Sequence, residues 1–362
     1  MRQTHKRQTH KRHKRHSHKN QTQKRNGGAT TKIQTFFDSI GPTATHTTNN
    51  NTNNNTNNNT NNNTNNNTNN NTNNNTTFKK QQCSPYSKSL NKKTQMSDKS
   101  CYSKSHLDSL KDMWNSKNTA NKIISTEPHQ IWGDLKSRFS NICDKESCWY
   151  SQFAKTNHID ITELFAPKSP NTWKINPNEW LNSTDIIKVM AQYTKEYKCF
   201  EFIGPSPIDF DVMETPTECV WDELCKFSLD TQIKKGKYKI GFIFNTDPHT
   251  EDGEHWISLF INIRKGIIFY FDSAGKVVPP TIKVFVDRVI AQGKKMKIPI
   301  KLKFDQNYPK RHQYGRTECG IYSLYFIVQM LEDKLTAKYL KSHVINDKFV
   351  EQFRKIYYNE DI

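Results

Sequence analysis

Seven consecutive Asn-Asn-Asn-Thr repeats, from Asn49 to Thr76, limit what the amino-terminal third of this chain can fold into. The repeat contains no apolar side chain, so it cannot bury the surface that would offset the entropy of ordering it. The first 32 residues are equally unsuited to a core, because they carry 11 Lys or Arg, five His and no acid. We therefore predict a disordered arm over residues 1–120, basic at its start and rich in Asn and Thr.

The charge of the chain is concentrated in this arm. The whole chain has a net charge of +19, and residues 1–120 account for +16 of it, whereas residues 121–362 carry +3. The arm also explains why hydrophobic residues make up only 33% of the chain, below the roughly 45–50% (a figure that counts Gly) of ordinary globular chains. Residues 121–362 are long enough for one sizeable core, so we expect a single folded domain there.

The apolar pattern of this domain predicts a mixed α/β fold. Helical spacing predicts four helices, the first with a cap at Asn182 or Ser183: residues 180–193, 281–292, 319–331 and 348–358. Apolar runs predict four strands, the first of them central in its sheet: residues 238–245, 256–263, 267–272 and 300–304. The short connection Arg264-Lys265-Gly266 indicates a hairpin between the second and third strands.

The eight cysteines form no Cys-x-x-Cys motif, and the spacings of Cys143/Cys148 and Cys219/Cys225 are too loose for a zinc knuckle. We therefore expect neither a metal nor another cofactor. No apolar segment follows the basic start of the chain as it would in a secretory signal, so we expect a protein that is not secreted and has reduced thiols. No stretch approaches the ~18–20 apolar residues of a membrane-spanning helix, and we expect no membrane contact.

Cys319 is the strongest candidate for a nucleophile. It stands at the start of the predicted 319–331 helix, where the helix dipole favours a thiolate over a thiol. The segment that precedes it is a polar loop, from which a nucleophile is readily exposed. We interpret the other seven cysteines as packing residues: Cys83, Cys101, Cys143, Cys148, Cys199, Cys219 and Cys225.

His255 and Asp272 are the candidate base and its orienting acid. They stand at the outer ends of the predicted hairpin. In a hairpin with a two-residue loop, the residue numbers of directly opposed positions sum to an odd value. The sum of 255 and 272 is also odd, so the two side chains project from the same face of the hairpin. A carboxylate there fixes the imidazole tautomer and supports the imidazolium that a Cys–His pair needs. Gln313, shortly before Cys319, is the candidate side-chain donor to an oxyanion. His312 is a rival base, which we interpret as a surface residue.

Four features of this sequence resemble the signature of the Ulp1/adenain clan of cysteine proteases: His255-Trp256, Asp272, Gln313 and Cys319-Gly320. The clan includes proteases for SUMO and related modifiers, the adenovirus protease and core proteases of large DNA viruses. The order His, Asp, Gln, Cys matches, as does the 17-residue gap between the His and the Asp. The segment around Cys319 is most similar to the large-DNA-virus branch.

The resemblance implies a papain-like α+β fold with a mixed sheet flanked by helices, and with its core at about residues 170–335. It implies that Cys319 is the nucleophile and that His255 is the general base and then the general acid. Asp272 would orient the histidine, and Gln313 would donate to the oxyanion.

Trp180 and Trp256 resemble the two aromatic residues with which the clan confines a narrow substrate segment that contains Gly. Trp180 begins the sequence Trp-Leu-Asn-Ser-Thr-Asp-Ile, which is similar to the clan's tryptophan-containing substrate motif. These two residues are therefore the implied substrate-binding residues.

The viral branch implies a thiol endopeptidase that processes structural polyproteins at Gly-Gly or Ala-Gly sites during virion maturation, in the virion or the host cytoplasm. Removal of SUMO or ubiquitin-like modifiers is the alternative within the same class. A nucleic-acid-binding or scaffold protein on an inactive protease fold is the alternative from another class, and the complete set of four residues speaks against it. For residues 1–32 we expect either non-specific nucleic-acid contact or a localisation signal.

Overall fold

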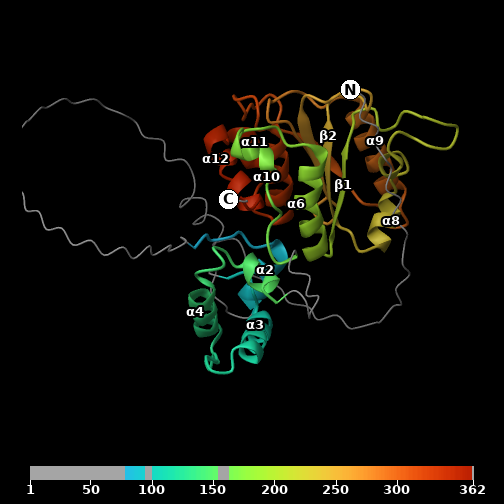
Figure 1. Cartoon of the computed structure of the whole chain (residues 1–362). Coiled ribbons are helices and arrows are strands. Elements are labelled where there is room, and N and C mark those ends of the chain that lie inside the picture. Colours follow the sequence, from blue (N-terminus) through green and yellow to red (C-terminus); the bar gives the residue numbers. More distant parts are fainter. Residues whose placement is uncertain (1–77, 94–99, 154–162, 361–362) are drawn as a thin grey trace, which may run out of the picture. The chain divides into compact units, whose positions relative to one another are not determined.

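The computed structural model describes residues 78–93, 100–153 and 163–360, and every structural statement below concerns those residues (Figure 1). Residues 1–77, which contain the Asn-rich tract and the basic start, lie outside them, so a disordered arm there stays a prediction. The described chain begins with four helices: α2 (Pro85–Lys93), α3 (Lys104–Lys117), α4 (Pro128–Phe139) and α5 (Ser147–Ser151). No helix of the described part is long and apolar enough to cross a bilayer.

Helices α2 and α3 lie within residues 1–120, so the folded part of the chain begins earlier than the sequence analysis predicts. Leu107 and Leu110 of α3 are fully buried, and they share a core with Leu135 and Phe139 of α4. Apolar residues are few in α3, but they are spaced on one face of the helix. Averaging composition over 120 residues concealed that face, because the Asn-rich tract dominates the average.

Three pairs of cysteines are joined as disulfides, which contradicts the expectation of reduced thiols: Cys83–Cys101, Cys143–Cys148 and Cys219–Cys225. These six residues therefore do more than fill space in a core. Cys199 and Cys319 are the free cysteines. Two of the pairs join cysteines that are close in the chain and that the sequence analysis considered only as zinc ligands, whereas folding brings Cys83 and Cys101 together over 18 positions.

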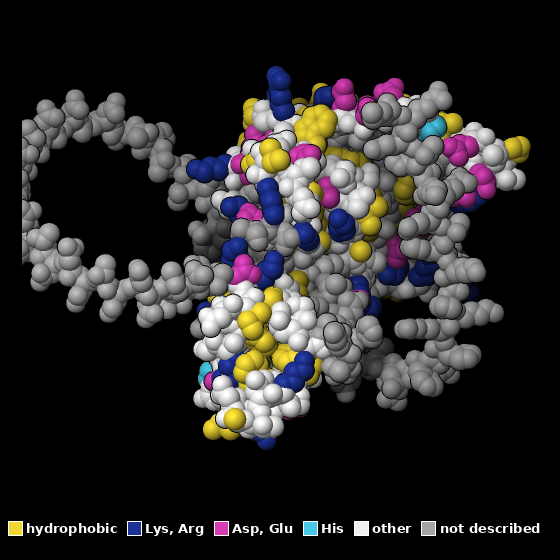
Figure 2. All heavy atoms as spheres, in the orientation of Figure 1, with side chains coloured by type: hydrophobic (Ala, Val, Ile, Leu, Met, Phe, Trp, Pro, Cys, Tyr) yellow, Lys and Arg dark blue, Asp and Glu magenta, His cyan; other side chains and the backbone are white. Residues whose placement is uncertain are grey.

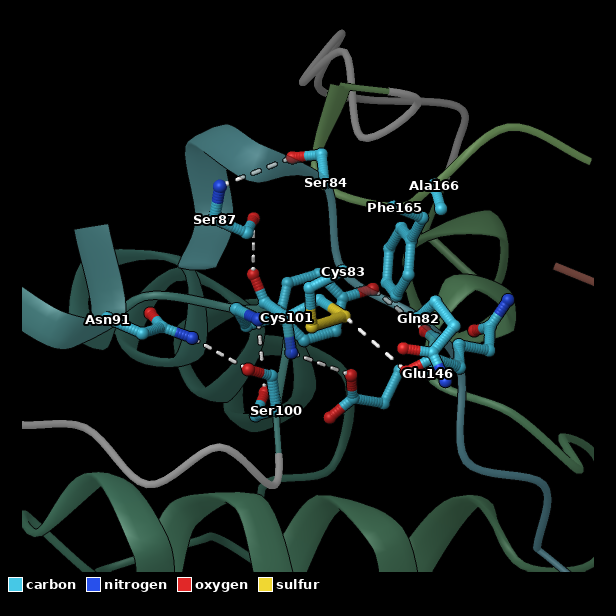
Figure 3. The surroundings of a disulfide bond; sticks show 12 residues. Gln82, Cys83, Ser84, Ser87, Asn91, Ser100, Cys101, Glu146, Phe165 and Ala166 are labelled. Carbon is cyan, nitrogen blue, oxygen red and sulfur yellow. Dashed lines mark hydrogen bonds between the residues drawn. A yellow bond between two sulfur atoms is a disulfide. The ribbon is translucent and has the colours of Figure 1, made fainter. Parts of the chain in front are cut away.

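The first disulfide ties several segments of the helical part together (Figure 3). The Ser87 hydroxyl of α2 donates to the Cys101 carbonyl (2.9 Å), and the Cys101 N–H donates to the Glu146 carboxylate (3.0 Å). Glu146 is buried, and desolvation raises the pKa of its carboxyl despite these hydrogen bonds. Cys83 also forms an isolated β-bridge with Phe165, so the disulfide joins both ends of the helical part.

The larger part of the chain is built on a five-stranded sheet whose strands lie in sequence order: β1 (Phe200–Ser206), β2 (Lys239–Asn245), β3 (Trp256–Asn262), β4 (Ile267–Phe271) and β5 (Lys303–Gln306). The β1/β2 and β4/β5 pairs are parallel, whereas β2/β3 and β3/β4 are antiparallel. This mixed sheet confirms the predicted α+β class. Strand β2 is an interior strand, as its apolar run predicts.

Helices cover both faces of the sheet, with α6 (Ser183–Glu196) and α10 (Cys319–Leu331) on one face and α8 (Leu229–Lys234) and α9 (Pro280–Lys295) on the other (Figure 1). Successive residues of β3 supply opposite cores, because strand side chains alternate in direction: Phe260 packs on the α10 side and Leu259 on the α9 side. Every residue of α10 is buried, which explains why the sequence of this helix is apolar on all sides.

Several predicted elements are confirmed, and two differ. Helix α6 begins after the predicted cap Asn182, whose side chain accepts the Asp185 N–H, and α10 spans the predicted range. Strand β5 begins three residues later than predicted. The predicted helix 348–358 is two short helices, α12 (Asp347–Glu351) and α13 (Arg354–Tyr357). The remaining elements are η2 (Asn171–Lys174), α7 (Asp222–Cys225) and α11 (Ala337–Ser342).

Candidate active site

Cys319 is the first residue of α10 and follows a loop that runs from the end of β5. The first N–H groups of a helix have no partner within it, and together with the dipole they favour negative charge at this end. Cys319 therefore stands at the helix start at which the sequence analysis places it. Only 3% of the residue is exposed.

His255 and Asp272 meet at the open end of the β3–β4 hairpin. Ser258 lies opposite Phe271 in the ladder, an odd-sum register that confirms the predicted parity. His255 Nε2 lies 2.8 Å from Asp272 Oδ1, while the same oxygen also accepts the Ala274 N–H (2.7 Å). With Nε2 engaged by the carboxylate, Nδ1 is the ring nitrogen left for Cys319.

Asn307 fixes the backbone of the catalytic acid, and the sequence analysis missed it. The Asp272 N–H donates to Asn307 Oδ1 (2.9 Å), and Asn307 Nδ2 donates back to the Asp272 carbonyl (2.8 Å) and to the Lys310 carbonyl (2.7 Å). The Asn307 side chain is fully buried. Its position directly after β5 is the only sequence signal, and many structural asparagines share it.

The electrostatics of His255 favour an ion pair with the nucleophile. Burial on its own lowers the pKa of the imidazole, but hydrogen bonds to Asp272 and Cys319, together with attraction to both negative charges, raise it to about 9. The imidazole therefore holds its proton at neutral pH, when a thiolate stands beside it. A thiolate–imidazolium pair is the state from which a cysteine nucleophile attacks.

Gln313 lies within 3.5 Å of Glu318, the residue before Cys319, and is held from two sides. Its Oε1 accepts the Ser273 hydroxyl (2.6 Å), and its backbone N–H donates to the Ser273 carbonyl (2.8 Å). Its Nε2 donates to the Gly315 carbonyl (3.2 Å) and lies 3.5 Å from Glu318 Oε2. Since Ser273 occupies the amide oxygen, the amide is oriented with its N–H groups toward the loop that precedes Cys319.

Trp256 and Trp180 have different surroundings. Trp256 is 9% exposed and packs in the same core as Cys319, and its indole Nε1 donates to the Leu181 carbonyl (2.8 Å). A Cβ on Gly320 would lie 2.9 Å from the Leu181 Cβ. Trp256 thus holds the segment at Leu181 against the start of α10, where only glycine fits. Trp180, next to Leu181, is 46% exposed and available to a substrate.

His312 is buried, so its interpretation as a surface residue is wrong. Its ring packs 5.3 Å from Phe271, and its Nδ1 accepts the Ile345 N–H (3.1 Å). Desolvation lowers the pKa of His312 to about 4, so the imidazole is neutral. Its engagement with the backbone gives it a structural role, which leaves His255 as the base.

No group of three or more His, Cys, Asp or Glu side chains that could hold a metal ion occurs in the described part of the chain.

We expect Gln313→Ala to lower kcat for peptide cleavage by about 10²–10³-fold with little change in KM, because an oxyanion donor acts mainly in the transition state. Ser273→Ala should have a smaller effect in the same direction, since it leaves the amide in place but removes its anchor. Steady-state kinetics on both folded variants measures this difference. A folded Gln313→Ala variant with the kcat of the original protein would exclude the role.

Comparisons with known proteins agree with this geometry. Residues 235–362, which contain all four candidate catalytic residues, match the Ulp1 protease family, C-terminal catalytic domain. A protein of Acanthamoeba polyphaga mimivirus named as a thiol protease is 28% identical over 237 residues, which are 62% of this chain and 74% of that protein. An African swine fever virus protein named as a SUMO-1 cysteine protease is 27% identical over 226 residues, 59% of this chain and 81% of that protein.

The fold comparison extends beyond the catalytic domain. The crystal structure of the African swine fever virus protease has a TM-score of 0.54 and 22% identity with this chain, and it covers 78% of this chain and 97% of its own. This likeness shows the fold.

Proposed function

We propose that this cysteine protease, whose residues 235–362 match the catalytic domain of the Ulp1 protease family, is an endopeptidase that cleaves viral structural polyproteins after small residues. The proposed nucleophile is Cys319, with His255 as base and acid, Asp272 as its orienting group and Gln313 as an oxyanion donor.

The proposed reaction proceeds in two steps. The Cys319 thiolate attacks the peptide carbonyl carbon, and the oxyanion that forms accepts hydrogen bonds from Gln313 and from the Cys319 N–H. The His255 imidazolium gives its proton to the leaving amine as the C–N bond breaks, which leaves a thioester. His255, now neutral, takes a proton from water, which attacks the thioester and releases the carboxylic acid and the thiolate.

The observation that carries the preference for small residues is the packing of Leu181 on Gly320. It brings the segment of Trp180 within van der Waals contact of the nucleophile's own helix. A bulky side chain directly before the scissile bond would compete with Leu181 for this space. Glycine or alanine at that position, as in Gly-Gly or Ala-Gly, fits this space.

Two observations support a viral polyprotein as the substrate. Two relatives that each match more than half of this chain, from Acanthamoeba polyphaga mimivirus and African swine fever virus, are named as proteases. The similarity to the African swine fever virus protease structure covers 78% of this chain, far more than the catalytic domain of residues 235–362. Cleavage within the virus particle is the corresponding proposed location. A second candidate, removal of SUMO-like modifiers, is favoured by the name of the African swine fever virus relative.

Two kinds of substrate separate these candidates. We expect the full chain to cleave internally quenched peptides with Gly-Gly or Ala-Gly at their centre and residues on both sides. We also expect slower turnover of fluorogenic SUMO and ubiquitin carboxyl-terminal derivatives, which lack a peptide on the leaving side. Peptides with Leu or Phe in place of the Gly before the scissile bond are the matched control and should resist cleavage. Turnover of the modifier derivatives alone would contradict the polyprotein proposal and favour the second candidate.

A further inference from the structure

A second cleft of about 640 Å³ lies between the segment that follows Ser169 and the last helices of the chain. Its lining includes Trp173 of η2 and Tyr358, whose rings lie 5.0 Å apart in an edge-on contact, and Arg354 of α13, whose guanidinium carbon lies 4.6 Å from the centre of the Trp173 ring. None of the candidate catalytic residues lines this cleft. It is therefore a separate feature from the site around Cys319.

The side chain of Arg354 is the unusual element of the cleft. The residue is 6% exposed, and its Nη2 donates to the Thr317 carbonyl (3.2 Å). Its Nε and Nη1 have no hydrogen-bond partner among the described residues, and no carboxylate of the described chain lies within ion-pair distance. Arginine stays charged in proteins, and a buried charge that lacks partners is strongly unfavourable. Two N–H groups are thus left for a ligand that carries negative charge.

The surroundings of Arg354 fit an anion. Three more cations line the cleft, Lys174, Lys348 and Lys355, against two acids, Glu351 and Glu360. Glu360 lies 3.8 Å from Lys355, which offsets its charge. Burial and repulsion by Glu318 raise the pKa of Glu351. Figure 2 shows Lys and Arg side chains spread over the face that carries α6, α10 and α12.

We propose that this cleft binds an acidic peptide segment, with one carboxylate on the free N–H groups of Arg354 and an apolar side chain against the Trp173 ring. A planar guanidinium offers two parallel donors that match a carboxylate. The Trp173 ring, 4.6 Å from the guanidinium carbon, supports the cation and leaves an apolar wall for the neighbouring side chain. A free phosphate would satisfy Arg354 but leave this wall uncovered, so a peptide fits the cleft better.

The test is a fluorescence-anisotropy titration with the full chain carrying Cys319→Ala, which prevents cleavage of the probe. The probe is a fluorescein-labelled decapeptide in which Leu alternates with Asp and Glu, and the control peptide has Asn and Gln in place of the acids. We expect the acidic peptide to bind at least tenfold more tightly than the control, and its affinity to fall as salt rises. Equal affinity for the two peptides would overturn the proposal.

Variants locate the binding. Arg354→Met should weaken binding at least tenfold, and Arg354→Lys should restore part of it. The pair Lys348→Ala/Lys355→Ala changes only exposed residues, so it tests the cleft even if the Arg354 variants do not fold; it should weaken binding several-fold. Lys294→Ala/Lys295→Ala, at the exposed end of α9, is the matched control and should bind as before. If the Lys348→Ala/Lys355→Ala variant bound the acidic peptide with unchanged affinity, a peptide site in this cleft would be excluded. Binding of inorganic phosphate that depends on Arg354, without binding of the peptide, would exclude it as well.

Discussion

Replacing Cys319 with alanine should reduce peptide cleavage by at least about 10³-fold, because the variant lacks the atom that forms the thioester. The residual rate would come only from substrate binding and the oxyanion donors. The side chain removed is small and lies at the start of a fully buried helix, so the fold should survive. Steady-state cleavage of an internally quenched Gly-Gly peptide, together with a thermal melt, separates loss of chemistry from loss of folding.

The matched control is Cys199→Ala, which removes the other free cysteine of the described chain. Cys199 lies directly before β1 and is half-buried, and we expect this variant to cleave the peptide at the original rate. A Cys319→Ala variant as active as the original protein would refute the nucleophile assignment. Such a result would favour the alternative hypothesis that the protein is a scaffold built on an inactive protease fold.

Replacing His255 with alanine should lower kcat/KM by about 10³-fold or more, since the thiolate loses its counter-ion and the leaving amine loses its proton donor. His249→Ala is the control: this histidine lies in the same loop but pairs with Asp209, 2.7 Å away. The measurement is kcat/KM of both variants on the same peptide. An equal loss of kcat/KM in the two variants would show that cleavage depends on the structure of the loop and not on the His255 imidazole.

The pH dependence follows from the same pair. The pKa of His255 is raised from 6.5 to about 9, so the imidazolium persists above neutrality, and kcat/KM should decline as the pH rises through about 9. A raised pKa also means that the His255 interactions stabilise the fold fully below pH 6.5, and that this contribution is lost as the pH rises through about 9. In Asp272→Asn the acceptor remains but the charge is gone, so the alkaline decline should move to lower pH. An unchanged pH profile of kcat/KM in Asp272→Asn would show that the charge of the Asp272 carboxylate does not raise the pKa of His255.

The sequence was sufficient to propose a candidate catalytic set, because the chemistry constrains residue type and order; the roles of its members stay predictions. A thiolate benefits from a helix start, and the apolar run after Cys319 predicted that helix. The parity of His255 and Asp272 depends only on the hairpin loop, which the sequence shows directly. The general fold class followed from the same periodicities.

The supporting residues could not be predicted, because their roles arise from contacts between distant segments. Asn307 holds Asp272 across 35 positions, and Ser273 holds Gln313 across 40. Leu181, which precedes α6, packs on Gly320 of α10. None of these pairs has a local spacing that would indicate a contact, and a buried asparagine or leucine has many other uses.

The errors have related causes. Composition averaged over residues 1–120 concealed the apolar face of α3, since the repeat tract dominates the average. His312 follows a run of polar and basic residues, yet its ring lies behind Phe271 and is fully buried. Cys143/Cys148 and Cys219/Cys225 were considered only as metal ligands, although these cysteines form disulfides, and the pairing of Cys83 with Cys101 depends on how α2 packs. In each case the environment of a residue in the folded chain differs from the environment that its neighbours in the sequence indicate.

The most direct test of the thiolate–imidazolium pair is the alkylation rate of each cysteine by iodoacetamide at about pH 6, where ordinary thiols with a pKa near 8.5 are almost wholly protonated. Peptide mapping by mass spectrometry compares Cys319 with Cys199, the internal standard in the same molecule. The account predicts rapid labelling of Cys319 and slow labelling of Cys199, with the advantage of Cys319 lost in His255→Ala. Equal labelling of the two cysteines in the unchanged protein, or an undiminished rate at Cys319 without His255, would contradict it.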